Sequence, residues 1–286
     1  MSETKLYICG TPIGNLEDIS LRALKVLEKV DYIAAEDTRR TKNLLNHYEI
    51  DAELISYHEH NEEEKSAEII KMLKAGQEIA LVSDAGMPGI SDPGYKLTSL
   101  ADKEDIKVVP IPGPTAMTAA LVASGLPTDK FVFEGFLPRK EKQRQERLKE
   151  LSSETRTLVF YESPYRLKDS LESILNILGD RKIAVWREIT KKFEEKVSGQ
   201  VSEVLNHFEE EDPKGEITIV LRGIDSAQLH CKEAAWKELT ILEHIKLMMD
   251  KGITKKEAVK LVAEERGLPK REVYEEAIVI DAQVEK

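Results

Sequence analysis

The chain has 286 residues, of which 41% are hydrophobic and 33% are charged, and its formal net charge is -11. This composition is typical of a soluble globular protein, and the length predicts two domains, each with its own hydrophobic core. The acidic balance excludes a protein that coats nucleic acid indiscriminately, so any contact with RNA must depend on local basic patches.

The amino-terminal residues MSETKLYICG lack the basic and apolar segments of an export signal, and no apolar run is long enough to span a bilayer. The only cysteines of the sequence are Cys9, in the first predicted strand, and the distant Cys231. Such a pair makes no disulfide framework, which favours a reducing compartment. We therefore expect a cytoplasmic protein without a membrane segment.

The first predicted strand covers residues 6–9 and leads into the loop GTPIGNLEDIS, which is followed by a helix with an apolar face over residues 23–30. The loop resembles a phosphate-binding turn, but it has neither the GxGxxG spacing nor the lysine of a P-loop. A nucleotide-binding hydrolase is therefore the least favoured function.

Charged side chains follow the second predicted strand, residues 31–35, in the sequence EDTRRT. Open α/β sheets bind their ligands at the carboxyl ends of their strands. This position makes Glu36, Asp37 and Arg39 candidates for catalysis and Arg40 a candidate for contact with RNA. The alternative is an ordinary helix start, capped by Asp37 and surrounded by solvated charges.

The sequence LVSDAGMPGISDPGY joins a short apolar strand to a loop that is too rich in Gly, Pro and Asp for a simple connection. Asp84 supplies an acceptor at the strand end, and Gly86 permits close approach of the backbone to a ligand. Asp92 and Pro93 are expected to cap and begin the next helix. The loop therefore predicts a ligand site, with a surface turn as the alternative.

A third loop, PGPTAM, follows the strand predicted over residues 108–111, and Thr115 and Ala116 open a helix whose first backbone N–H groups face any ligand there. We expect the three loops to meet at one edge of the sheet. His58 and His60 lie in another loop with no cysteine nearby, so we assign no metal.

The remaining sequence predicts a second α/β domain and then a helical tail. Strands are expected at residues 131–134, 157–161, 183–186 and 217–221, with a charged hairpin before the last of them. In the tail, Thr254 and Glu257 predict a capping box, and Gly267 predicts a break between two short helices. The predicted parts are an amino-terminal α/β domain (1–116), a second α/β domain (117–225) and the tail (226–286).

Basic residues gather at the start of one helix of the second domain, with glutamates between them. The cluster consists of Arg139, Lys140, Lys142, Arg144 and Arg147. A solvated helix face is one interpretation. A second basic cluster in the tail, on a segment that resembles a helix-turn-helix, keeps contact with RNA open as the other.

Several motifs together resemble the tetrapyrrole methylase family, and in particular its branch that acts on ribosomal RNA of the small subunit. They are GTPIGNLEDI, AEDTRRT, LVSDAGMPGISDPGY, PIPGPTAMTAALVASGLP, FYESPYRL and KKEAVKLVAEERGLPKREVY, which cover essentially the whole chain. The resemblance implies a two-domain α/β homodimer that binds S-adenosylmethionine between its domains. It also implies methylation of the ribose 2′-hydroxyl of a cytidine in 16S ribosomal RNA of the small ribosomal subunit.

The resemblance further implies which residues contact the methyl donor. They are Pro12, Ile13, Asp84, Gly86, Met87, Thr115, Ala116 and Tyr161. Where porphyrin-modifying relatives carry Gly-Asp-Pro in the opening loop, this chain has Ser83-Asp84-Ala85, so the acidic residue is kept and its neighbours differ.

Methyl transfer from a sulfonium is an in-line displacement that depends mainly on positioning, but a ribose hydroxyl also needs a base, or a cation that stabilises its oxygen. Glu36, Asp37 and Arg39 are the first candidates and Lys191 and Glu194 the second, and the resemblance does not choose between them. Two other functions stay open: a small-molecule methylase of the tetrapyrrole type and a non-catalytic ribosome-assembly factor. The basic helix and the tail disfavour the first of these, because a porphyrin-sized substrate requires neither.

Overall fold

The structure is a computed structural model that describes residues 4–210, 213–225, 239–250 and 253–284. Cys231 lies outside these ranges. The chain forms two compact units, Met1–Gly223 and Ile224–Lys286, which are described separately. The first unit contains two five-stranded sheets and the second contains helices, so the predicted fold class is confirmed.

The first sheet is parallel throughout and has the strand order β3-β2-β4-β1-β5. Its strands are β1 (Lys5–Cys9), β2 (Tyr32–Ala35), β3 (Glu53–Ser56), β4 (Ile79–Val82) and β5 (Lys107–Ile111). Because parallel strands place their carboxyl ends at one edge, the loops that follow them gather there. This edge holds the three Gly/Pro-rich loops expected from the sequence.

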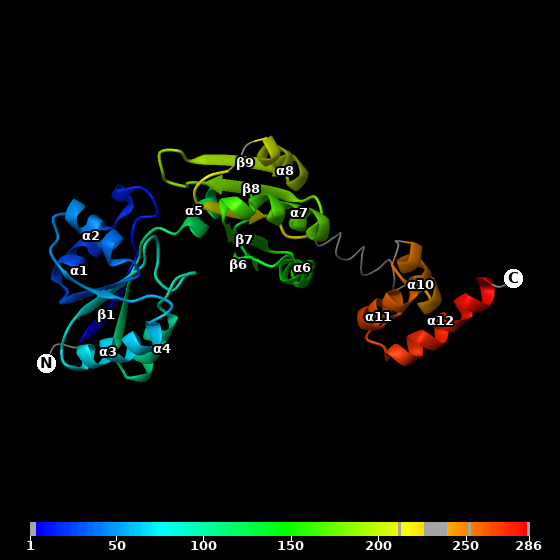
Figure 1. Cartoon of the computed structure of the whole chain (residues 1–286), viewed down its shortest axis with the longest axis horizontal. Coiled ribbons are helices and arrows are strands. Elements are labelled where there is room, and N and C mark those ends of the chain that lie inside the picture. Colours follow the sequence, from blue (N-terminus) through cyan, green and yellow to red (C-terminus); the bar gives the residue numbers. More distant parts are fainter. Residues whose placement is uncertain (1–3, 211–212, 226–238, 251–252, 285–286) are drawn as a thin grey trace. The chain divides into compact units, whose positions relative to one another are not determined.

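Alternating side chains of β1 face opposite sides of this sheet, as the period of a strand requires. Leu6 and Ile8 pack with α3 (Glu62–Lys74) and α4 (Tyr95–Lys103). Tyr7 and Cys9 pack with α1 (Leu21–Lys29) and, through the same core, with α2 (Thr38–His47). Helices therefore cover both faces, with α1 and α2 on one side of β1 and α3 and α4 on the other (Figure 1).

Two of the predicted helix starts are confirmed by their caps. The Asp37 carboxylate accepts a hydrogen bond from the Arg39 N–H at the start of α2, at 2.9 Å. The Thr115 hydroxyl accepts one from the Thr118 N–H at the start of α5 (Ala116–Ala123), at 3.3 Å. A short polar side chain before each helix satisfies a backbone donor that the first turn leaves free.

The predicted helix start at Asp92 is wrong. α4 begins only at Tyr95, and its N-cap residue is Gly94, with φ 152°. Ser91 also has a positive φ, of 61°, so the chain turns sharply on both sides of Asp92 and keeps that residue in the loop. The carboxylate is thereby left available to the site at the sheet edge.

The second sheet is mixed, with the order β6-β7-β10-β8-β9. Its strands are β6 (Phe131–Phe136), β7 (Thr157–Glu162), β8 (Lys182–Arg187), β9 (Glu195–Gln200) and β10 (Ile217–Leu221). Only β6 and β7 pair in parallel. β8 and β9 form the predicted charged hairpin, whereas the helix α8 (Val201–Glu210) that follows was not predicted.

Helices also cover both faces of the second sheet. α6 (Glu141–Glu150), α7 (Leu167–Leu178) and α8 pack on one face, around Phe160 and Ile219. α5 packs on the other face, where Ala120 and Leu121 contact Val159. The first unit also contains two short 3-10 helices, Leu16–Asp18 and Pro164–Arg166, and the second of them begins with Pro164 after Ser163.

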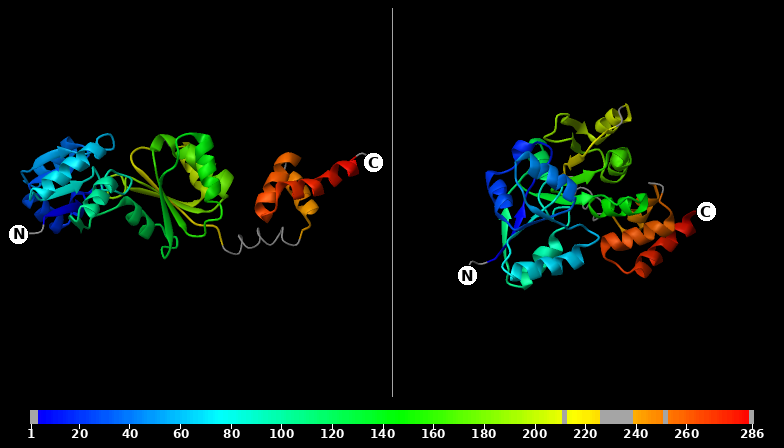
Figure 2. Two further views of the ribbon diagram at one scale, coloured as in Figure 1. Left: turned by 90° about the horizontal axis from the view of Figure 1, so that it is seen from below. Right: turned by 60° about the vertical axis from the view of Figure 1, so that its left-hand side comes forward.

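In the described residues of the second unit, three helices form a cluster, drawn in orange and red in Figure 2. They are α10 (Ile241–Asp250), α11 (Lys255–Arg266) and α12 (Lys270–Val284). Ile245, Val259 and Val273 are buried in their common core. Thr254 is the N-cap residue of α11, but its hydroxyl donates to the Glu257 carboxylate at 2.7 Å and caps no backbone N–H, so the predicted capping box does not form. Gly267 ends α11 in a left-handed conformation, as predicted. Over the described ranges, no helix has the length and apolar character needed to cross a membrane.

Candidate active site

The loops that follow β1, β4 and β5 are joined to one another by backbone contacts. Thr11 and Gly86 exchange two backbone hydrogen bonds, of 2.9 and 3.0 Å, and the Gly10 N–H donates to the Ile111 carbonyl. Gly10 and Gly113 pack so closely that a Cβ on Gly10 would lie 2.6 Å from the Gly113 Cα. Glycine is required there because the two backbones touch.

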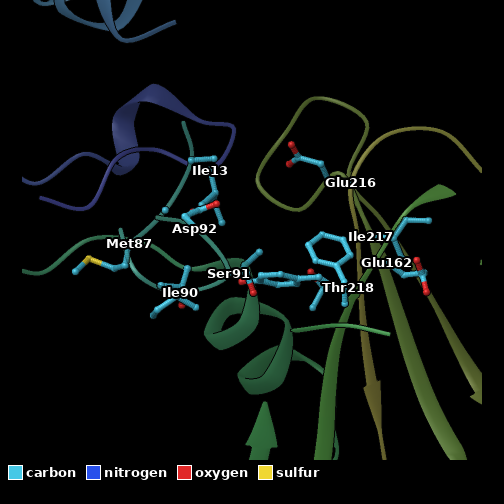
Figure 3. A pocket seen from close by; sticks show the side chains of 15 residues that line it. Ile13, Met87, Ile90, Ser91, Asp92, Glu162, Glu216, Ile217 and Thr218 are labelled. Atoms are coloured by element: carbon cyan, nitrogen blue, oxygen red, sulfur yellow. The ribbon is translucent and has the colours of Figure 1, made fainter. Parts of the chain in front are cut away.

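A cavity of about 190 Å³ opens at this edge and is also lined by the second sheet (Figure 3). The loops of the first sheet, together with the start of α5, contribute Ile13, Ala85, Gly86, Met87, Ile90, Ser91, Asp92, Thr115 and Ala116. The second sheet contributes Phe136, Tyr161, Glu162, Glu216, Ile217 and Thr218. The wall is thus apolar over much of its area, with carboxylates from both sheets.

The residues predicted to contact a methyl donor divide between two hollows. Six of them, Ile13, Gly86, Met87, Thr115, Ala116 and Tyr161, line this cavity. Pro12 and Asp84 instead line a second hollow of about 350 Å³, together with Arg40. Pro12 and Ile13 therefore face different hollows, as Asp84 and Gly86 do. Successive side chains of an extended backbone point to opposite sides, which allows this division.

Two of the three carboxylates in the cavity wall have a cation beside them. Glu162 is almost fully buried and accepts hydrogen bonds from the Arg166 Nε, at 2.8 Å, and from the Ser170 hydroxyl, at 2.6 Å. Glu216 pairs with the Lys191 Nζ at 3.0 Å. Both carboxylates therefore take part in ion pairs, but only Glu162 is a buried charge, because 69% of the Glu216 side chain is exposed.

Asp92 is the third carboxylate of the wall, and its surroundings favour the protonated form. Burial raises the pKa of Asp92 to about 7, and the negative charges of Glu36, Asp84 and Glu216 add to that shift. A hydrogen bond with Ser83 opposes the shift without cancelling it. Desolvation and nearby negative charges both destabilise the ionised carboxylate, and each therefore raises its pKa.

Glu36, Asp37 and Arg39, the first candidates for catalysis, do not line either hollow. Asp37 and Arg39 bond to each other at 2.8 Å, and the Arg39 side chain is 89% exposed. The hydrogen bonds from Arg39 lower the pKa of Asp37 to about 2, so it remains a surface carboxylate and a helix cap. Glu36 is half-buried, and burial followed by the charge of Asp84 raises its pKa.

Comparison with known proteins decides the family. The sequence model for Tetrapyrrole (Corrin/Porphyrin) Methylases matches residues 5–205. The chain belongs to this family. It is 49% identical over 269 residues to a "Ribosomal RNA small subunit methyltransferase I" of Halalkalibacterium halodurans, covering 94% of this chain and 93% of that protein.

A protein of the same name from Thermotoga maritima is 54% identical over 219 residues, which cover 77% of this chain but 98% of that relative. The rest of this chain therefore has almost no counterpart there. Among solved structures, the uroporphyrin-III-C-methyltransferase of Thermus thermophilus superposes with a TM-score of 0.53 at 22% identity, covering 76% of this chain and 93% of that one. The likeness shows that the two share a fold.

Lys191 and Glu194, the second candidates for catalysis, lie in the turn between β8 and β9 and line neither hollow. Lys191 pairs with Glu188 at 2.8 Å as well as with Glu216. Burial lowers the Lys191 pKa, but the two carboxylates outweigh burial and the net shift is upward. Its methylene chain covers Gly14, where a Cβ would lie 2.3 Å from the Lys191 Cγ. Lys191 therefore fastens the first loop to the second sheet.

The prediction that the whole basic cluster contacts RNA is wrong for Arg144. Only 5% of Arg144 is exposed, and its Nε donates to the Ser173 hydroxyl at 3.0 Å. Its position could have been found from the sequence, because residues 144, 148 and 151 recur at helical spacing and the last two are core leucines. Arg147 pairs with Glu134 at 2.7 Å and with Glu150 at 2.5 Å.

The rest of the cluster faces solvent. Arg139, Lys140 and Lys142 are exposed, and none of the three forms an ion pair with a residue that the structure describes. These three residues are called the α6 cation group below.

The sequence assigned no metal to His58 and His60, and the rings of these two residues lie 5.9 Å apart. Across the described chain, no three His, Cys, Asp or Glu side chains are grouped to hold an ion.

Sequence reasoning did not find Phe136, Glu162, Glu216, Ile217 and Thr218 as site residues, and it gave Asp92 another role. Glu216, Ile217 and Thr218 come from the beginning of β10 rather than from the end of a strand. The one available signal was charge, because Glu162 ends the buried and mostly apolar strand β7 and Glu216 precedes the buried strand β10.

Proposed function

We propose that this protein uses S-adenosylmethionine to methylate the ribose 2′-hydroxyl of a cytidine in 16S ribosomal RNA of the small subunit. Relatives that are 49% and 54% identical carry the name of a methyltransferase for small-subunit ribosomal RNA. The observation that carries the proposal is the cavity, which lies where three backbone-rich loops meet the second sheet.

The cavity wall fits a methyl donor of this class. Ile13, Met87 and Ile90 give apolar surface for a nucleoside, and Gly86, with φ 84°, lets the backbone approach closely. Thr115 and Ala116 bring the start of α5, whose free N–H groups favour an anionic group such as a carboxylate. When bound, the donor supplies a methyl group on a positively charged sulfur.

The surface of the second domain fits unpaired RNA. Phe136 lines the cavity and is 57% exposed, and Tyr165, three residues beyond Glu162, is 94% exposed. Solvent-exposed aromatic rings beside a basic group are the usual means of holding single-stranded bases and phosphates. The α6 cation group lies at the start of the helix that follows the strand of Phe136, with Arg139 and Lys140 just before α6 and Lys142 in its first turn, and it supplies the positive charge.

A small-molecule methylase is the second candidate, because the solved structure of a uroporphyrin methyltransferase shares the fold. The much higher identity to the ribosomal RNA relatives favours the RNA substrate. We also propose that two copies of the chain form the active species, as the resemblance to the tetrapyrrole methylases implies. Sedimentation of the purified protein tests this, and a monomer at assay concentrations would contradict it.

The function is tested with small subunits from cells that lack the modification. The subunits are incubated with the protein and a donor that carries a labelled methyl group, and the label is then located in the RNA. A 2′-O-methyl group removes the nucleophile of alkaline cleavage, so the labelled nucleotide should resist base. Label at one cytidine of 16S RNA is expected. Label on a base, or transfer to a porphyrin instead of RNA, would contradict the proposal, and no transfer to any acceptor would favour an assembly factor.

A further inference from the structure

The chemistry of a ribose hydroxyl requires a group that takes its proton, and the cavity offers few. Glu162 is held by Arg166, and Glu216 is held by Lys191. Asp92 lines the same wall, and no lysine or arginine within the described part of the chain forms an ion pair with it. Asp92 is therefore the one carboxylate of the wall whose oxygens are not already committed to a cation.

The position of Asp92 also suits contact with an acceptor. Figure 3 shows Asp92 and Ile13 on one side of the cavity and Glu216 on the other. Ser83, which hydrogen-bonds with Asp92, lines the second hollow together with Arg40. Asp92 thus lies where the two hollows adjoin, in a loop whose backbone is held in unusual conformations at Ser91 and Gly94. Such strain is typical of positioned functional groups.

We propose that Asp92 is the general base of the methyl transfer, an inference that rests on the proposed function. The Asp92 carboxylate accepts the proton of the acceptor ribose hydroxyl while that oxygen forms a bond to the methyl carbon. The carbon–sulfur bond breaks at the same time, and its electron pair stays on sulfur, which becomes a neutral thioether. The carboxylic acid of Asp92 then releases its proton to water. Charge balances, because one cation and one carboxylate give neutral products.

The negatively charged groups that face Asp92 raise its pKa into the range that suits a general base. Glu36 follows β2, Asp84 follows β4 and Glu216 begins the segment of β10, and all three raise the pKa of Asp92 to about 7 after burial itself. Burial also raises the pKa of Tyr161, which stays neutral and accepts the Met117 N–H at 3.2 Å. A base whose pKa lies near the working pH combines a useful deprotonated fraction with a strong tendency to accept a proton.

The test compares the wild-type protein with Asp92→Asn and Asp92→Glu. Single-turnover methylation of small subunits, with saturating donor, is measured from about pH 5.5 to about pH 9. The wild-type rate should rise with pH and level off above about pH 7, where Asp92 is deprotonated. Asp92→Asn should be slower by about 10²-fold to 10⁴-fold and lose this pH dependence, because an amide accepts no proton. Asp92→Glu should keep part of the rate.

Two measurements do not depend on turnover. Donor affinity by calorimetry should change less than about tenfold in Asp92→Asn, a difference of about 1.4 kcal/mol. The unfolding of the donor-free protein should lose the pH dependence that a buried carboxyl causes. Asp102→Asn is the matched control, since this exposed aspartate lies in the last turn of α4, at the opposite edge of the sheet.

The possible outcomes distinguish a wrong assignment of the general base from a wrong proposed function. If Asp92→Asn methylates at the wild-type rate with the wild-type pH profile, Asp92 is not the base. If its rate falls only in proportion to donor affinity, Asp92 binds the donor and the proposal is also overturned. If the wild-type protein transfers no methyl group to small subunits, the proposed function fails. The inference about Asp92 is then overturned with it, whatever the unfolding data show.

Discussion

Replacing Asp92 by Asn should stabilise the donor-free protein, and more so at higher pH. The folded-state pKa of about 7 lies above the ordinary value of 3.8. The folded protein therefore keeps a proton on Asp92 that the unfolded chain has already released. Wild-type stability should consequently fall as the pH rises from about 4 to about 7 and then stay level, whereas the neutral amide is insensitive to pH.

The size of the effect follows from the shift of the pKa. One unit corresponds to about 1.36 kcal/mol, so a shift from 3.8 to about 7 sets an upper value of about 4 kcal/mol. Asp92 keeps some contact with solvent, which weakens the penalty, and we expect about 2 to 4 kcal/mol at pH 8. At pH 4 the two proteins should differ by only about 0.6 kcal/mol, because Asp92 is then almost fully protonated when folded and only about 60% ionised when unfolded.

Urea unfolding followed by tryptophan fluorescence measures this difference. A Trp236→Phe background leaves Trp186, on β8 of the first unit, as the reporter. Asp102→Asn in the same background controls for the loss of one negative charge. Parallel stability curves for the wild type and Asp92→Asn between pH 4 and pH 8 would refute the reasoning, since the carboxyl would then have an ordinary pKa in the folded state.

The other predictions concern RNA, the first loop and the tail. Replacing the α6 cation group by alanine should weaken binding to small subunits and reduce the slope of log affinity against log salt by up to about 3 units, whereas Lys71→Ala with Lys103→Ala, at the far sheet edge, should leave both unchanged. Equal slopes would mean that the group is only a solvated face. Gly14→Ala places a Cβ 2.3 Å from the Lys191 Cγ and should lower the melting temperature and donor affinity, by about 1 to 3 kcal/mol in stability. Lys191→Ala in the same chain should restore much of this loss, and no restoration would show that the contact is not the cause. Deleting residues 226–286 should leave donor affinity by calorimetry nearly intact and lower methylation, because the cavity lies wholly in the first unit. A folded truncation that no longer binds donor would contradict this division.

Much of this protein was determined by sequence alone, because the relevant physics is local. The continuous apolar run at residues 6–9 predicts a strand that is buried on both faces, and Leu6, Tyr7, Ile8 and Cys9 are all buried in β1. Asp37 and Thr115 cap helices through hydrogen bonds that span two or three residues. The rule that parallel sheets bind ligands at the carboxyl ends of their strands located the three loops. Tyr161, near the end of β7, was implied only by the resemblance to the tetrapyrrole methylases.

Only the tertiary structure decided which groups complete the site. β10 runs antiparallel to β7, so Ile217 pairs with Glu162 and the beginning of β10 lies beside the end of β7. A rule about strand ends therefore missed Glu216, whose place depends on a pairing across more than fifty residues of chain. The role of Asp92 depended on backbone angles at Ser91 and Gly94 that keep it out of α4. Its lack of a cation depended on where Arg166 and Lys191 point, because ion pairs form between side chains that only packing brings together.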